Sequence, residues 1–160
     1  MREAYIQECK RIQENCTYTA EAHHIIALRS RRLSLGFQAV PAAIAALLAS
    51  LAASGVFGLW AGWVSAIAAV ISAVGNVLDP LKSYYDHINA AKNFTALKHD
   101  ARALHETFCL GLDDSELAFE VKKLHDRYND LVKFVPQTDD KAFELARQKI
   151  QKGIHEPDEL

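Results

Sequence analysis

The feature that most constrains this chain is residues 33–78, a stretch without a single Asp, Glu, Lys, Arg or His. A helix on the surface of a soluble protein keeps a polar face toward water, and this stretch offers no such face. As one helix it would be roughly 69 Å long at ~1.5 Å per residue, about twice the hydrocarbon thickness of a bilayer. We therefore expect two membrane-spanning helices joined by a turn.

The turn is predicted at residues 54–58, where a serine and two glycines interrupt the apolar stretch. Glycine and serine between two periodic segments are typical of a loop. The spans are then residues 33–53 and 59–78, each close to the ~20 residues that cross a bilayer. Trp60 and Trp63 follow the turn, and indole rings favour the headgroup level. The sequence thus predicts an antiparallel transmembrane hairpin.

The basic residues beside the hairpin predict its orientation. Arg29, Arg31 and Arg32 precede the first span, Lys82 follows the second, and the turn carries no Lys or Arg. Because positive residues stay on the cytoplasmic side, both termini are predicted to be cytoplasmic. The basic cluster also suits contact with anionic headgroups. The alternative is a soluble all-helical protein that buries its hairpin, since alanine lowers the hydrophobicity of both spans.

The charged segments on both sides of the hairpin are predicted to form further helices. Residues 1–32 form an amphipathic helix with an apolar stripe at steps of three and four. Residues 79–153 form a cytoplasmic bundle, with helices over residues 80–110, 115–135 and 140–152. Asp113 and Glu116 have capping-box spacing, Gly111 is predicted to end the preceding helix, and the tail 154–160 is predicted to be loose. The stripe of the first helix is Tyr5, Cys9, Ile12, Cys16, Ala20, His23 and Ile26.

Small residues recur at four-residue steps in both spans. Such rows let helix backbones approach closely in lipid, where packing drives association. They could pack the two spans of one hairpin, or they could also join hairpins into a homo-oligomer; the surplus of rows favours the second interpretation. The rows are Ala42, Ala46 and Ser50; Ala45, Ala49 and Ala53; Gly58, Gly62 and Ala66; and Ala69 and Ala73.

The sequence carries little that suggests chemistry. No pair of histidines has metal-ligand spacing with a matching acid, no glycine-rich phosphate loop occurs, and Cys109 near His105 lies at the end of an apolar seam. We expect no catalytic residue, no metal and no cofactor, and hence no enzyme. The formal net charge of −2 argues against binding to a nucleic acid polymer. Cys9, Cys16 and Cys109 form no disulfide pattern, which fits a reducing compartment.

The layout resembles the bacterial SLATT domains. The resemblance lies in a cytoplasmic helix that ends in basic residues, an Ala/Gly-rich two-span hairpin, and two cytoplasmic helices with the residues Tyr84-Tyr85-x-x-x-Asn89-Ala90-Ala91 and Tyr128-x-x-Leu131, the second closed by Pro136. It covers residues 10–150. It implies an effector in the bacterial inner membrane that oligomerises, perforates or depolarises that membrane and stops an infected cell from growing. A cyclic-oligonucleotide signal or a partner sensor protein would activate it, since the chain has no sensor domain of its own.

The sequence therefore predicts an all-α, homo-oligomeric protein with a two-helix transmembrane hairpin and a cytoplasmic helical bundle. It would act as a membrane effector of an antiphage, abortive-infection system. The alternative is a membrane-anchored helical scaffold that binds a partner protein without forming a pore. Polar or small residues within the membrane face protein or water, so the candidates for pore lining or helix packing are Gln38, Ser50, Gly58, Gly62, Ser65, Ala66, Ser72 and Asn76.

Overall fold

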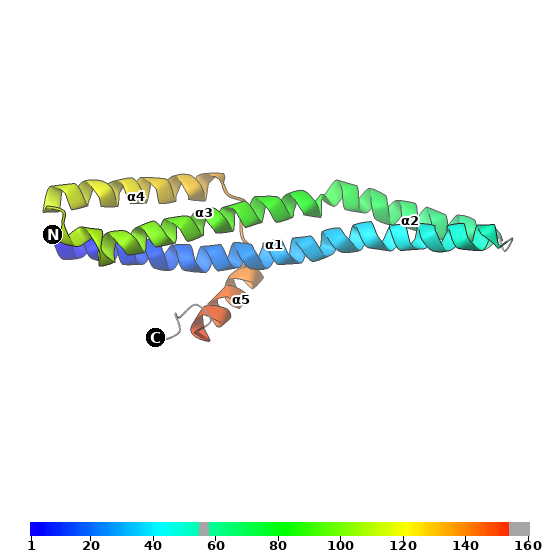
Figure 1. The fold of residues 1–160 in the computed structure, drawn as a ribbon, viewed down its shortest axis with the longest axis horizontal. Helices are drawn as coiled ribbons and strands as arrows, with labels where there is room; N and C mark the ends of the chain where they lie inside the picture. Colours follow the sequence, from blue (N-terminus) through cyan, green and yellow to red (C-terminus); the bar gives the residue numbers. More distant parts are fainter. Residues whose placement is uncertain (55–57, 154–160) are drawn as a thin grey trace. The chain divides into compact units, whose positions relative to one another are not determined.

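The computed structural model describes residues 1–54 and 58–153, and over these it is all-helical, which confirms the all-α part of the predicted fold class. The central residues of the predicted turn, 55–57, and the tail, 154–160, lie outside the described residues. Figure 1 shows the element order, which is α1 (Arg2–Ala53), α2 (Leu59–Leu78), α3 (Pro80–Glu106), the 3₁₀ helix η1 (Phe108–Leu110), α4 (Asp114–Phe134) and α5 (Asp140–Gln151).

Helix α1 joins the predicted amphipathic helix to the first predicted span without a break, with Pro41 inside it. Two compact units share this helix. The bundle unit consists of Met1–Ala27 and the chain from Tyr85 onward, and the hairpin unit is Leu28–Tyr84. Both α1 and the helix that begins at Leu59 contain a segment long and apolar enough to cross a membrane, judged by length and composition.

The core of the bundle unit lies between α1, α3 and α4, which run side by side (Figure 1). Most of the predicted stripe of α1 is buried, while Tyr5 and Ile26 at its two ends are half-buried. The buried residues of the stripe are Cys9, Ile12, Cys16, Ala20 and His23. Helix α3 contributes Phe94, Leu97, Ala101 and Leu104, and α4 contributes Leu117, Val121 and Leu124. The steps of three and four residues in all three helices create one continuous apolar interface.

Helix α4 begins with the predicted capping box. The Asp113 carboxylate accepts from the backbone N–H groups of Ser115 and Glu116, and the Glu116 carboxylate accepts from the Asp113 N–H at 3.0 Å. These backbone donors lower the pKa of Asp113, because they stabilise its ionised form. Four otherwise unpaired N–H groups begin every helix, and this motif satisfies part of them.

The predicted end of α3 is wrong by about a turn. Helix α3 ends at Glu106, η1 follows, and Gly111 has φ −98°, outside the left-handed conformation of a helix-ending glycine. After Glu106 the chain tightens into i→i+3 hydrogen bonds, in which the Gly111 N–H donates to the Phe108 carbonyl at 3.1 Å. The Arg2 guanidinium donates to the carbonyl oxygens of Cys109 and Leu112 and pairs with Asp114 at 3.3 Å. These carbonyls lie within and beyond η1, so Arg2 holds the segment between η1 and α4 against the N-terminal end of α1.

Helix α5 packs on α1 within the bundle unit (Figure 1). The Asp139 side chain caps it by accepting from the Ala142 N–H. The Tyr18 and Phe143 rings lie 6.1 Å apart, and the Lys149 ammonium pairs with the Glu21 carboxylate at 2.7 Å. One aromatic contact and one ion pair therefore position the last helix.

The hairpin unit packs through a seam with steps of three and four residues in both helices. In this seam α1 places partly buried Phe37, Pro41, Ile44, Leu48 and Leu51, and α2 places Ala61, Val64, Ala68, Ile71 and Gly75. Such spacing is typical of two antiparallel helices that interlock their side chains. Every residue of the predicted small-residue rows is exposed instead. The hairpin therefore closes without those rows.

Candidate functional site

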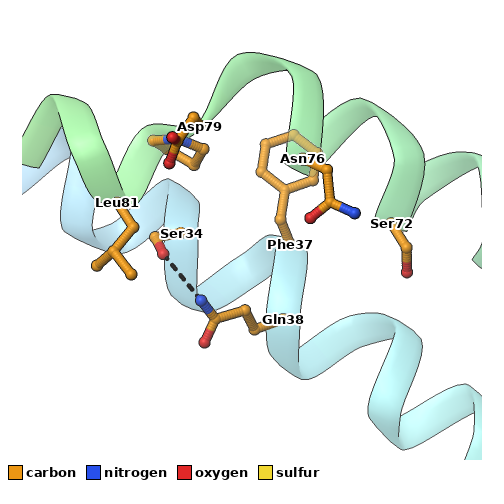
Figure 2. A pocket seen from close by; sticks show the side chains of 9 residues that line it. Ser34, Phe37, Gln38, Ser72, Asn76, Asp79 and Leu81 are labelled. Atoms are coloured by element: carbon orange, nitrogen blue, oxygen red, sulfur yellow. Dashed lines mark hydrogen bonds between the residues drawn. The ribbon is translucent and has the colours of Figure 1, made fainter.

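A polar pocket of about 550 Å³ lies at the end of the hairpin unit where the charge-free stretch begins and ends. Figure 2 shows that α1 and α2 contribute facing sets of side chains. The first set is Ser34, Phe37 and Gln38, and the second is Ser72, Gly75 and Asn76, with Asp79, Pro80 and Leu81 completing the lining. Each set has the spacing i, i+3, i+4, which places its three members on one helix face.

Gly75 lets the two helices approach at this pocket. A Cβ atom added to Gly75 would lie 2.8 Å from the Phe37 Cβ and 2.9 Å from its Cγ. The aromatic ring of Phe37 therefore packs directly on the backbone of α2 (Figure 2). This contact closes the apolar side of the pocket and leaves the polar side chains around the remaining space.

Asp79 connects α2 to α3 at the edge of the pocket. Its backbone is left-handed, with φ 39°, and its N–H donates to the Gly75 carbonyl at 3.1 Å, which ends α2. One carboxylate oxygen accepts from the Lys82 N–H at 3.1 Å, which caps α3. Only Gly, Asn and Asp adopt this conformation readily, so one residue serves both helix ends.

The pocket brings together three of the eight predicted lining or packing candidates, Gln38, Ser72 and Asn76. The Gln38 amide donates to the Ser34 hydroxyl oxygen at 3.2 Å, and Ser34 is only 4% exposed. Asn76 and Ser72 make no hydrogen bond through their side chains to any residue that the structure describes. Sequence reasoning missed Ser34, whose signal was its four-residue spacing to Gln38.

The other five candidates lie away from this pocket. The Ser50 and Ser65 hydroxyls donate to carbonyls of their own helices, Leu47 at 3.0 Å and Ala61 at 2.9 Å. Such bonds satisfy a hydroxyl without water. Gly58, Gly62 and Ala66 are exposed, as are the predicted interface residues Trp60, Trp63, Arg29, Arg31, Arg32 and Lys82.

A second polar feature lies in the bundle unit, where the rings of His23 and His87 meet. Their Nδ1 atoms are 2.8 Å apart, the residues are 1% and 7% exposed, and the His23 ring stacks on Phe94 with centroids 5.8 Å apart. Two imidazoles can share this bond only when one Nδ1 donates and the other accepts. Burial first, then the neighbouring histidines His87 and His24, lowers the pKa of His23 to about 4, and burial lowers the pKa of His87.

Acidification should therefore weaken the bundle unit. The unfolded chain binds protons at a histidine pKa near 6.5 and the folded His23 only near 4, so stability is lost as pH falls through that range. A tenfold change in proton affinity is worth about 1.4 kcal/mol, so the loss by pH 4 is on the order of 3 kcal/mol. Asp86 and Asp139 favour protonation of His87 and reduce the effect there. Urea unfolding from pH 7.5 to 4.5 measures it.

The double variant His23→Gln, His87→Gln should flatten this pH dependence, because neither titrating ring remains. The exposed residue His99 provides the matched control, and His99→Gln should keep the wild-type slope. An unchanged slope in the double variant would show that other groups govern the acid response.

The three cysteines are all buried in the bundle unit. Burial raises the pKa of Cys9 to about 11 and of Cys16 to about 12, so both are thiols at neutral pH. The Cys109 thiol donates to the His105 carbonyl at 3.0 Å, while the His105 ring contacts Gln13 at 2.6 Å. Among the described residues no three His, Cys, Asp or Glu side chains are arranged to hold a metal ion.

Comparison of the chain with protein-family models, with curated proteins and with solved structures yields no match.

Proposed function

We propose that the chain is a membrane effector whose hairpin crosses the bacterial inner membrane, assembles with further copies and makes the membrane leaky. One observation carries the proposal, namely the apolar outer surface of the hairpin unit. The most apolar 18-residue segment of α1 is 0% buried, and the corresponding segment of the helix that begins at Leu59 is 11% buried. The core helix of a soluble protein would be largely covered.

Lipid is the solvent that suits this surface. Leu47, Ile67 and Val70 are among the large apolar side chains that point outward, and no charged residue accompanies them within 33–78. Apolar surface in water costs roughly 25 cal/mol per Å², whereas a bilayer accepts it. Backbone polar groups in hydrocarbon must be paired internally, and continuous helices meet that requirement.

The flanking charges support an orientation with both termini in the cytoplasm. The exposed residues Arg29, Arg31, Arg32 and Lys82 flank one end of the hairpin. Positive residues remain on the cytoplasmic side, and anionic headgroups there attract them. The bundle would then lie in the cytoplasm, where its three buried cysteines remain reduced thiols.

The exposed small-residue rows are suited to assembly. The hairpin seam uses other residues, so Gly58, Gly62 and Ala66 remain available to a neighbouring copy. A Cβ at Gly62 would meet nothing within 4 Å, which leaves room for close approach of a second helix. In such an assembly Gln38, Ser72 and Asn76 would face the lumen at its cytoplasmic mouth.

The resemblance to SLATT domains gives this assembly a role, which is to depolarise an infected cell and stop its growth. The trigger would be a cyclic oligonucleotide or a sensor protein acting on the bundle. Expression in bacteria loaded with a membrane-potential dye tests the proposal. If the pore is constitutive, we expect the potential to fall within minutes of induction. If it is gated, we expect the fall only when an enzyme that makes the cyclic oligonucleotide is expressed as well. Unchanged potential in both cases would refute perforation.

A second candidate function is a membrane-anchored scaffold, favoured by grooves between α3 and α4. Two grooves of about 340 and 260 Å³ meet at Arg127, whose guanidinium pairs with Asp100 at 2.8 Å. Exposed Phe134 lines one groove and exposed Phe108 the other. Exposed aromatic residues near an arginine are typical of protein interfaces. This function predicts that no level of expression depolarises the cell.

A further inference from the structure

We infer that the polar pocket of the hairpin unit binds the headgroup of a phospholipid that combines a phosphate with a primary ammonium group, as phosphatidylethanolamine does. The inference rests on the membrane insertion proposed above and not on perforation. It concerns the pocket of a single hairpin, before any assembly with other copies.

The position of the pocket limits what can occupy it. Arg32 is the last charged residue before the charge-free stretch and Asp79 is the first after it. The pocket residues Ser34 and Asn76 lie within one helical turn of those charges. With the hairpin in a bilayer, this level is the boundary between hydrocarbon and headgroups. Lipid headgroups and water are the groups available there.

Two unpaired hydrogen-bonding side chains of the pocket suit the phosphate half of this headgroup. The Asn76 amide and the Ser72 hydroxyl project from α2 toward the side that carries Gln38, and they have no partner among the described residues (Figure 2). These groups can donate to phosphate oxygens. Water can also bind these groups at this level, but a phosphate accepts stronger, charge-assisted hydrogen bonds from them.

Asp79 supplies the site for the ammonium group. Its carboxylate is the only formal charge in the pocket lining, and one oxygen already caps α3. The second oxygen remains for a ligand. An ammonium group donates charge-assisted hydrogen bonds to a carboxylate. The quaternary ammonium of phosphatidylcholine has no N–H to donate, and phosphatidylglycerol has no cation, so both should bind less well.

The acyl chains of such a lipid have a surface to follow. Leu81 and the Phe37 ring form the apolar part of the lining. Exposed Ala45 on α1 and exposed Ala69 on α2 continue the pocket side of the two helices, seven residues after Gln38 and three residues before Ser72. A headgroup in the pocket thus leaves its chains along apolar surface. This arrangement separates lipid from soluble phosphoethanolamine, which would gain only the polar contacts.

The test is native mass spectrometry of the full chain in a neutral detergent, with phosphatidylethanolamine, phosphatidylcholine or phosphatidylglycerol of identical acyl chains. We expect phosphatidylethanolamine to bind at least tenfold more tightly than the other two. Asp79→Asn should abolish that preference, because asparagine keeps both the left-handed conformation and the cap but lacks the charge. Asn76→Leu should weaken phosphatidylethanolamine binding by about tenfold. Ser65→Ala, outside the pocket, should change nothing.

Three results would overturn the inference: equal binding of the three lipids, unchanged preference in Asp79→Asn, or equally tight binding of phosphoethanolamine without acyl chains. Thermal unfolding of each variant by circular dichroism establishes that it is folded. The result is independent of perforation. Selective binding by a chain that never depolarises cells would keep the lipid site and remove the pore, whereas depolarisation without selectivity would remove the lipid site alone.

Discussion

Cells that express the Gly62→Leu variant should keep their membrane potential, although the hairpin itself remains folded. A side chain at Gly62 meets nothing within 4 Å in the single chain, and leucine is favourable in hydrocarbon. The leucine would, however, separate two helices that approach through the row Gly58, Gly62 and Ala66. Depolarisation by the dye assay should fall at least tenfold, and the oligomer should shrink on a native gel.

Two further glycines provide matched controls for this experiment. A Cβ at Gly36 would also meet nothing within 4 Å, and Gly36 lies in none of the small-residue rows, so Gly36→Leu should depolarise cells like the wild type. Gly75→Leu should instead disturb the hairpin itself, because its side chain would collide with Phe37. If Gly62→Leu depolarises cells as fast as Gly36→Leu does, the row takes no part in assembly.

Phe94→Ala should destabilise the bundle unit by about 3–5 kcal/mol, the range measured for large core aromatic residues. Phe94 is 0% exposed, and its ring lies against His23 and Tyr128, with centroids 5.8 and 6.3 Å away. Truncation would leave a cavity between α1, α3 and α4 and would remove the stacking partner of the histidine pair. Urea unfolding of the purified protein in detergent, followed by circular dichroism, measures the change.

Phe134→Ala is the control for this loss, because Phe134 is 86% exposed. A surface substitution of this kind shifts stability by at most about 0.5 kcal/mol. Equal destabilisation by the two variants would mean that Phe94 does not hold the three helices together. Under the scaffold hypothesis Phe134→Ala should still weaken partner binding, so the same variant serves both questions.

Local sequence signals predicted the helices well because helix ends depend on nearby residues. Helix α1 ends at Ala53 and α2 begins at Leu59, close to the predicted bounds of the two spans, and Asp79 with Pro80 separates α2 from α3. The capping box of Asp113 and Glu116 marked the start of α4 correctly. The end of α3 was mispredicted because the chain continues after Glu106 as a 3₁₀ helix, and Gly111 does not adopt the left-handed conformation that the prediction required.

The candidate site was harder to predict because it depends on how two helices are rotated about their axes. The sequence identified Gln38, Ser72 and Asn76 as polar residues in an apolar stretch, but the same argument also chose Ser50 and Ser65, whose hydroxyls bond to their own helices. The contact between Gly75 and Phe37 fixes which faces meet. Likewise, the facing rings of His23 and His87 come from α1 and α3, 64 residues apart.

The most direct test of the account is where the protein lies after cell lysis and an alkaline carbonate wash of the membranes. We expect the full-length chain to remain in the washed membrane pellet and to enter solution only with detergent, because the outward faces of α1 and α2 within 33–78 are apolar and uncharged. Recovery as a monodisperse species in detergent-free buffer, with those faces covered by protein, would contradict the account.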